Sequence, residues 1–142
     1  MPKGGKKQPV AARPVLVVDD DPYITEVLTY TLRREAYAVE TAADGEQALQ
    51  KIRTSRPWLV FLDICLPGKT GTEVCQIVKA DPALADTHII MLTGRGLEEE
   101  DQVLARSAGA DEYLTKPFSP RAIAARVRSL AQARDGKASQ AT

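Results

Sequence analysis

Short apolar runs recur along this chain, and a stretch with helical periodicity follows each of them. Residues 15–18, 58–62 and 88–92 are apolar at nearly every position, and residues 37–41 and 112–114 form shorter runs. Continuous apolar runs, as opposed to alternating ones, are typical of strands that are buried on both faces of a parallel sheet. The chain is therefore predicted to be a parallel α/β protein, with the two shorter strands nearer the sheet edges.

Five amphipathic helices are predicted after these strands. Four of them have a clear apolar stripe, formed by Ile24, Val27, Leu28 and Leu32, by Ala48, Leu49 and Ile52, by Val74, Ile77 and Val78, and by Ile123, Val127 and Leu130. Each of these four follows a start signal, which is Asp21-Pro22, Asp44, the capping box at residues 70–73, or Ser119-Pro120. The remaining helix, around residues 98–107, has only Val103 and Leu104 in its stripe, which indicates a small or a mobile helix.

The alternation of strands and helices predicts a doubly wound three-layer sandwich, because strand–helix–strand crossovers are nearly always right-handed. We expect a flavodoxin-like (βα)5 fold whose five-stranded parallel sheet has the order 2-1-3-4-5. Residues 14–132 are predicted to form this single domain. Residues 1–13 are predicted to be a flexible basic tail, and residues 133–142 are too short and polar to fold.

Composition narrows the classes of protein that remain. The chain has 19 basic and 19 acidic residues, so no strong net charge draws it to nucleic acid or to a membrane surface. It contains no run of 18 apolar residues and no secretory signal, and Cys65 and Cys75 have neither metal-ligand spacing nor a disulfide framework. We expect a cytoplasmic protein with no direct nucleic-acid contact and no membrane insertion. The basic leader is interpreted as a solvated tail, with a partner-binding arm as the alternative.

Polar side chains collect where the predicted strands end. The first strand ends in Asp19-Asp20-Asp21, the third in Asp63, the fourth in Thr93-Gly94 and the fifth in Thr115-Lys116-Pro117. Ligands of open parallel sheets bind at this carboxyl edge, where the strand order reverses. With the first and third strands as neighbours, three carboxylates and Lys116 are expected to converge there. Asp21 itself is expected to cap the next helix.

Such a cluster predicts a particular chemistry. Closely packed carboxylates repel one another and are costly to desolvate, and a hard divalent cation resolves the conflict. Mg²⁺ prefers oxygen ligands and often shares carboxylates with phosphate oxygens, whereas nothing here offers the soft ligands of zinc or copper. Aspartate can also act as a covalent nucleophile toward phosphorus. The sequence therefore predicts a Mg²⁺-dependent phosphoryl site.

These segments resemble the receiver-domain family of two-component response regulators. Residues 17–22 resemble the acidic pair of the family, residues 61–68 its phosphoacceptor segment, and residues 92–94 its hydroxyl-plus-small-residue step. Residues 108–118 resemble the segment that holds its aromatic switch and its lysine. The similarity covers residues 14–132, and the ordered set of motifs is more specific than any one of them.

The resemblance implies the identity of the acceptor and of the metal ligands. Asp63 would attack phosphorus and become an aspartyl phosphate. Asp20, Asp63 and the backbone carbonyl of Cys65 would ligate Mg²⁺ directly, and Asp19 would hold the metal through water. Lys116 would pair with a phosphoryl oxygen, and the Lys116–Pro117 peptide bond is expected to be cis.

The resemblance also implies a conformational switch. The Thr93 hydroxyl and the amides of Cys65 and Gly94 would bind phosphoryl oxygens, and the movement of Thr93 would let Tyr113 rotate inward. That rotation would change the face formed by the fourth helix, the fifth strand and the fifth helix. The chain would thus be a signalling switch and not an enzyme, catalysing only its own phosphorylation and dephosphorylation.

Partners follow from the same resemblance. A sensor histidine kinase or a histidine phosphotransfer protein would supply the phosphoryl group, and a downstream protein would receive the signal. Phosphorylation-dependent dimerisation is expected through the face named above, with Asp111 or Glu112 pairing with Arg126 across the two-fold axis. The alternative is a monomer whose basic fifth helix is simply solvated.

Three residues depart from the pattern of the family. Thr70 stands where the family often has Asp, although threonine still caps a helix. Cys65 and Arg95 lie two residues after Asp63 and Thr93, at positions that tune the lifetime of the phosphate in the family. A redox role for Cys65 is disfavoured because no resolving cysteine is evident.

His88 is interpreted as an ordinary residue of the fourth strand, not placed to relay phosphate.

Two other function classes are considered. A Mg²⁺-dependent aspartyl-phosphate hydrolase usually has two aspartates two residues apart after its first strand, followed by a cap domain, and neither is present. A flavodoxin-like cofactor binder needs a Ser/Thr/Gly-rich phosphate loop after the first strand, where residues 19–21 would repel phosphate. The receiver is either a stand-alone regulator or a piece of a longer protein, and Met1 and the short tail favour the first.

Overall fold

One parallel sheet organises the computed structural model, which describes residues 13–94, 103 and 106–140. Its strands are β1 (Val15–Val18), β2 (Val39–Ala42), β3 (Leu59–Asp63), β4 (His88–Thr93) and β5 (Glu112–Thr115). Its helices are α1 (Pro22–Arg34), α2 (Gly45–Ser55), α3 (Gly71–Ala80) and α5 (Pro120–Gln140). All strand pairs are parallel, in the order β2-β1-β3-β4-β5. The predicted fold class and strand order are therefore confirmed.

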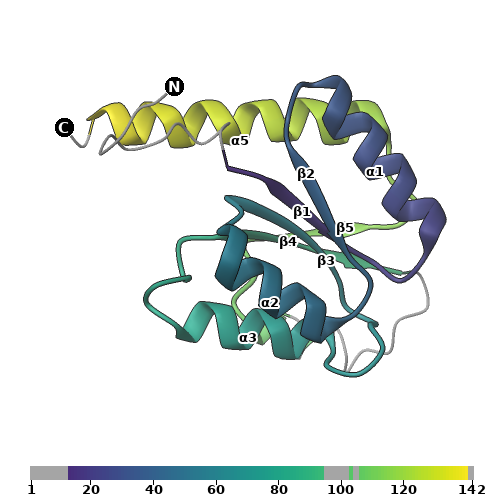
Figure 1. Ribbon diagram of the computed structural model, residues 1–142. Coiled ribbons are helices and arrows are strands. Elements are labelled where there is room, and N and C mark those ends of the chain that lie inside the picture. The colour runs from purple at the N-terminus through teal and green to yellow at the C-terminus, as the bar shows by residue number, and fades with distance from the viewer. Residues whose placement is uncertain (1–12, 95–102, 104–105, 141–142) are drawn as a thin grey trace.

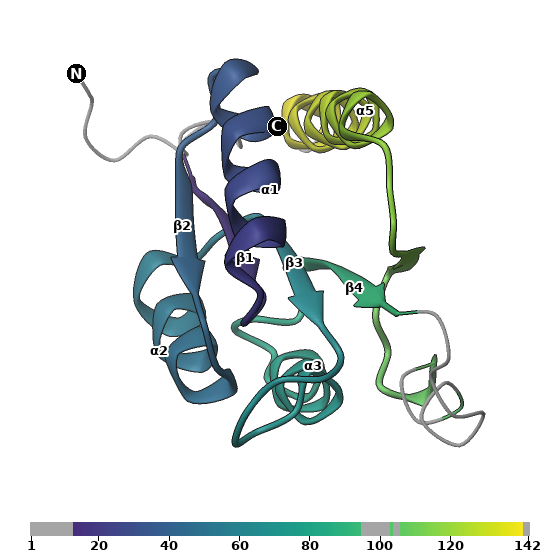
Figure 2. The same ribbon diagram turned by 90° about the vertical axis from the view of Figure 1, so that its right-hand side faces the viewer.

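The helices cover both faces of this sheet. Helices α1 and α5 lie on one face, and α2 and α3 lie on the other (Figures 1 and 2). Within β3, Leu59 and Phe61 join the core beneath α1 and α5, while Val60 and Leu62 join the core beside α2 and α3. Because successive side chains of a strand point to opposite faces, a strand buried on both faces must be apolar throughout. This explains the continuous runs in the sequence.

The helix starts agree with the predicted caps. The carboxylate of Asp21 accepts a hydrogen bond from the amide of Tyr23 at 2.9 Å, and that of Asp44 accepts one from Gln47 at 2.8 Å. At α3, Thr70 and Glu73 form the complete reciprocal capping box. These bonds satisfy amides that the first helical turn leaves unpaired. The threonine at position 70 thus begins α3 without an aspartate.

The structure corrects the C-terminal prediction. Helix α5 continues to Gln140, so residues 133–140 are helical and not part of an unfolded tail. Arg134 also donates a side-chain hydrogen bond to the backbone carbonyl of Asp86. The sequence offers good helix formers between residues 131 and 134, and a helix already begun extends at little cost. The prediction of an unfolded segment considered the length and polarity of these residues in isolation, and not as an extension of α5.

Other differences are small or lie outside the described residues. Strand β2 begins two residues later than predicted and β5 ends one residue later, which is usual for element boundaries. The predicted fourth helix falls for the most part outside the described residues, as do the first twelve residues and Arg95. Within the described part of the chain, no helix is both long and apolar enough to cross a bilayer.

Candidate functional site

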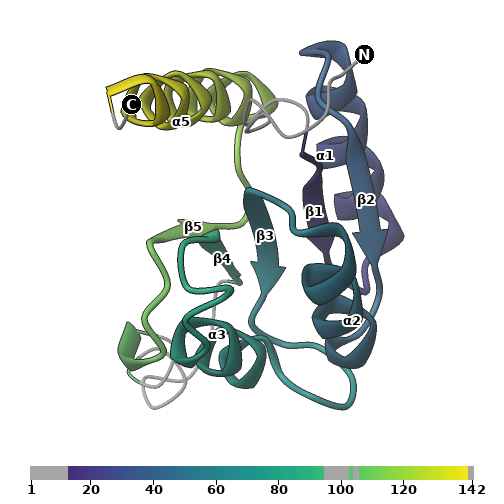
Figure 3. The same ribbon diagram turned by 60° about the vertical axis from the view of Figure 1, so that its left-hand side comes forward.

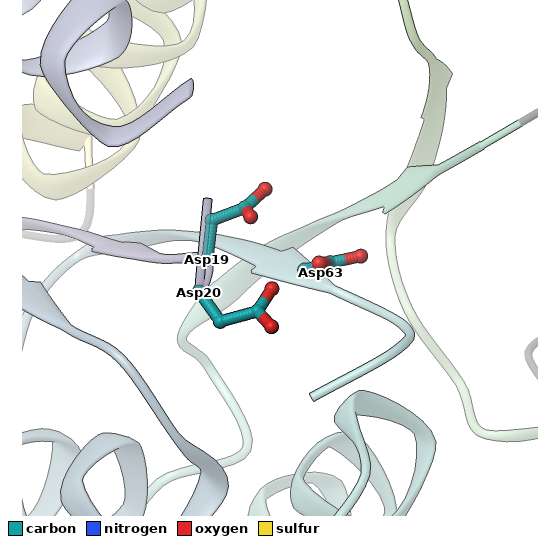
Figure 4. Close-up of side chains that lie close together, drawn as sticks. All are labelled: Asp19, Asp20 and Asp63. Carbon is teal, nitrogen blue, oxygen red and sulfur yellow. The ribbon is translucent and has the colours of Figure 1, made fainter. Parts of the chain in front are cut away.

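Three carboxylates meet at the carboxyl edge of the sheet. Asp19 and Asp20 follow β1, Asp63 ends β3, and one carboxylate oxygen from each lies within 4.8 Å of the others. Figure 4 shows the three side chains directed to the same side of this edge, and Figure 3 shows the neighbouring strands that carry them. Asp19 and Asp63 are buried, and Asp20 is exposed. The predicted convergence of these residues is present.

Lys116, the residue after β5, closes the cluster. Its Nζ atom lies 2.8 Å from Oδ2 of Asp19 and 3.6 Å from Oδ2 of Asp63. Although burial works in the opposite direction, the hydrogen bond with Asp19 and the charges of both carboxylates raise the pKa of Lys116 above its ordinary value. The lysine therefore stays charged and neutralises part of the acidic edge. The peptide bond from Lys116 to Pro117 is cis, as expected.

Asp63 has the most perturbed carboxyl group of the site. Burial, reinforced by the charge of Asp19, raises its pKa to about 6 from the usual 3.8, against the opposing effect of Lys116. Its Oδ1 accepts a hydrogen bond of 3.2 Å from the backbone amide of Cys65. A carboxylate in this setting is poorly solvated, so a nearby cation strongly favours its charged form.

Two glycines allow the loop after β3 to lie close to this edge. A Cβ at Gly71 would stand 2.0 Å from the carbonyl oxygen of Asp63, and one at Gly45 would stand 2.1 Å from that of Lys69. Gly71 also donates its amide to the carbonyl of Ile64 at 3.0 Å. The first turns of α2 and α3 therefore hold the loop that follows the candidate acceptor. Neither glycine is distinguished by the sequence pattern, because a close approach of this kind is a tertiary feature.

Thr93 ends β4 beside the cluster, and Gly94 follows it as an exposed residue. The Thr93 hydroxyl is directed toward β5, where it lies 3.3 Å from Oγ1 of Thr115 and 3.5 Å from the carbonyl oxygen of Leu114. Thr115 was predicted to lie at the end of its strand, without a role in the site. Its position between Tyr113 and Lys116 was the signal that could have drawn attention to it.

Tyr113, the predicted aromatic switch, is half-buried. It packs against the core on the α2 and α3 side of the sheet, and burial raises the pKa of its hydroxyl. The guanidinium of Arg106 lies 5.5 Å from the centroid of its ring, a cation–π distance. Tyr113 pairs with Met91 in the register of β4 and β5, two positions before Thr93 pairs with Thr115.

The charges predicted to cross a dimer axis are paired within the chain. Arg126 donates two hydrogen bonds to Glu112, at 2.9 Å and 2.7 Å, and His88 Nε2 lies 2.7 Å from the same carboxylate. Asp111 pairs with Lys79 at 2.9 Å and accepts an amide hydrogen bond from β4. His88 does begin β4, as predicted, but its contact with Glu112 was not foreseen. A dimer that used these residues would have to exchange existing pairs.

The acidic edge fits the divalent cation that the sequence predicts. Oδ2 of Asp19 is buried, and its polar neighbour is the ammonium of Lys116 at 2.8 Å. The donor set consists of oxygen atoms from three carboxylates on two adjacent strands. Mg²⁺ takes ligands of this kind and commonly keeps several waters. The residues present therefore suit Mg²⁺.

A doubly wound parallel sheet with three carboxylates and a lysine clustered at the carboxyl edge of β1 and β3 is typical of phosphoryl-receiving signalling domains. The chain belongs to the response regulator receiver domain family, whose sequence profile matches residues 15–128.

Named relatives agree with this assignment. The chain is 47% identical over 116 residues to the alkaline phosphatase synthesis transcriptional regulatory protein PhoP of Bacillus subtilis, covering 82% of this chain and 47% of PhoP. It is 45% identical over 115 residues to the DNA-binding response regulator MtrA of Mycolicibacterium smegmatis, covering 81% of this chain and 49% of MtrA. The chain thus spans about half the length of these relatives, both of which are named as regulators and neither as an enzyme.

Solved structures of similar proteins have the same fold. A putative response regulator from Chloroflexus aurantiacus aligns with a TM-score of 0.76 at 37% identity, over 84% of this chain and 98% of that one. The chemotaxis protein CheY4 of Vibrio cholerae aligns with a TM-score of 0.73 at 32% identity, over 82% and 97%. The resemblance stated from the sequence motifs is therefore confirmed at the level of family and fold.

Proposed function

We propose that this chain is a phosphorylation-dependent switch of two-component signalling, with Asp63 as its phosphoryl acceptor. The observation that carries the proposal is the setting of Asp63. It is a buried carboxylate at the end of the central strand, beside two other carboxylates and 3.6 Å from the ammonium of Lys116. The donor would be the phosphohistidine of a sensor kinase or of a histidine phosphotransfer protein.

In the proposed step, a carboxylate oxygen of Asp63 attacks the phosphorus atom of the donor. A P–O bond forms, the P–N bond of phosphohistidine breaks, and the leaving imidazole nitrogen takes up a proton from water. Lys116, whose ammonium lies 3.6 Å from Asp63, would pair with a phosphoryl oxygen, and the hydroxyl of Thr93 and the amides of Cys65 and Gly94 would bind the others. Catalysis then consists of positioning and of charge neutralisation, as in phosphoryl transfer generally. The chain would also assist the later hydrolysis of its own aspartyl phosphate.

Asp20, Asp63 and the backbone carbonyl of Cys65 would hold Mg²⁺ directly, and Asp19 would hold it through a water molecule. When bound, the cation would neutralise the negative charge that accumulates between the acceptor carboxylate and the phosphoryl group. The burial and mutual repulsion that raise the pKa of Asp63 support this arrangement, because a cation relieves both.

The output would follow from the movement of Thr93 toward the phosphoryl group and of Tyr113 into the space it leaves. Thr93 donates a hydrogen bond to β5 and Tyr113 belongs to that strand, so the change would be read by a downstream protein at the face that contains β5. A dimer through this face would require Glu112 and Arg126 to exchange their present partners. Residues 14–132 would form the switching unit, and the regulatory relatives favour a cytoplasmic location. The DNA binding in the name of MtrA belongs to a protein of which the matched segment is only about half.

Intact mass measurement tests the proposal. The protein would be incubated with Mg²⁺ and acetyl phosphate beside Asp63→Asn. We expect one added phosphate on the wild type, and none on the variant or without Mg²⁺. If no adduct forms, the next measurement is binding of beryllium fluoride, which mimics the phosphoryl group. Binding would indicate that the aspartyl phosphate forms and hydrolyses rapidly, whereas no binding would indicate that the site does not accept a phosphoryl group. Absence of both adduct and mimic binding would contradict the proposal.

A further inference from the structure

Thr93 and Thr115 are cross-strand partners at the carboxyl edge of β4 and β5. They face each other in the strand register, and their hydroxyl oxygens lie 3.3 Å apart, with Thr93 as the donor. The only other acceptor that the described residues offer this hydroxyl is the backbone carbonyl of Leu114, at 3.5 Å. The single hydrogen of the Thr93 hydroxyl is therefore shared between two acceptors, both on β5.

Thr115 and Tyr113 lie on the same face of β5. Leu114 joins the core beneath α1 and α5, whereas Tyr113 packs on the opposite face, and alternation places Thr115 on the Tyr113 side. The side chain of Thr115 thus lies next to that of Thr93, on the face of β5 that carries Tyr113, the predicted aromatic switch. Lys116, which closes the acidic site, is the next residue in the chain.

We infer that Thr115 is a positioning residue that holds the hydroxyl of Thr93 toward β5 and away from the phosphoryl site. The inference rests on the proposed function and deepens it, because it names a restraint on the switch. To bind a phosphoryl oxygen, Thr93 must give up its hydrogen bonds to β5. The carbonyl of Leu114 remains in any variant, so the Thr115 hydroxyl is the part of this restraint that a side-chain substitution can remove.

Replacement by valine removes the hydroxyl at nearly constant shape and retains a residue that strands favour. Both hydrogen bonds are long, so each is weak. We expect Thr115→Val to bind beryllium fluoride about threefold more tightly than the wild type at fixed Mg²⁺, as loss of one weak neutral hydrogen bond implies. Thr115→Ser retains the hydroxyl and should bind as the wild type does.

The experiment measures the half-saturating concentration of beryllium fluoride by fluorine NMR, with urea unfolding as a check on folding. Thr115→Val is compared with the wild type, with Thr115→Ser, and in a Thr93→Ala background. Tighter binding that requires Thr93 supports the inference, because a purely structural effect of valine would persist in that background. Equal or weaker binding by Thr115→Val overturns it. If the wild type itself binds no mimic, the proposed function fails first, and the inference fails with it.

Discussion

The ammonium nitrogen of Lys116 lies 2.8 Å from Oδ2 of Asp19, an oxygen on a side chain with no exposed surface. The lysine that is proposed to meet the phosphoryl group therefore has a buried carboxylate partner before any phosphoryl group arrives. A buried charge left without its partner is costly, so this pair links the stability of the domain to the chemistry of its site.

Lys116→Ala should destabilise the metal-free protein by about 2 kcal/mol, below the usual range for a buried pair because the lysine is partly exposed. Asp19 and Asp63 would then repel each other with no cation between them. Added Mg²⁺ should recover much of the loss, as measured by urea unfolding with and without the metal. Lys69→Ala is the matched control, because its partner Glu46 is largely exposed and their separation is 3.5 Å. A loss of similar size in both variants would contradict this account.

Asp20→Asn should weaken Mg²⁺ binding at least about tenfold while leaving metal-free stability unchanged or slightly increased. The carboxylate is exposed, so its removal loses a ligand and relieves repulsion without opening a cavity. Titration calorimetry measures both proteins. Asp21→Asn serves as the neighbouring control, because asparagine caps a helix as well as aspartate does. Equal loss of Mg²⁺ affinity in the two variants would refute the ligand assignment.

The contribution of Asp63 to metal-free stability should fall as pH rises between about 4 and 6. Asp63 has a folded-state pKa of about 6, against 3.8 for an ordinary carboxyl group. Across this window the folded protein binds more protons than the unfolded chain, so rising pH favours unfolding. Asp63→Asn should lack this part of the dependence in urea melts taken without metal. The prediction would be contradicted if the free energy of unfolding of the metal-free wild type rose through this pH window relative to that of Asp63→Asn.

Gly71→Ala should cost about 2 kcal/mol or more, because its new methyl group would collide with the backbone of Asp63. Mg²⁺ affinity should fall as well, since the collision displaces the acceptor. Gly94→Ala is the control, because a Cβ there would meet nothing within 4 Å. Thermal unfolding and calorimetry of the two variants give the comparison. An unperturbed Gly71→Ala would mean that the loop is not held as described.

Much of the fold could be predicted from local pattern. A run such as residues 15–18 is apolar at every position because both faces of β1 are covered, and caps such as Thr70 lie close in sequence to the amides they bind. The acidic edge could be anticipated because strand ends of a parallel sheet meet. The sequence could not predict contacts between residues of different elements, such as His88 with Glu112 and Gly71 with Asp63. These contacts depend on the tertiary approach of elements and leave no periodic signal.

The central claim is that Asp63, and not a neighbouring carboxylate, receives the phosphoryl group. The most direct test is to treat the phosphorylated protein with borohydride, which reduces an acyl phosphate to an alcohol, and to map the altered residue by peptide mass spectrometry. The account predicts homoserine at position 63, and none in protein that was never phosphorylated. Reduction at Asp19 or Asp20, with position 63 unaltered, would contradict it.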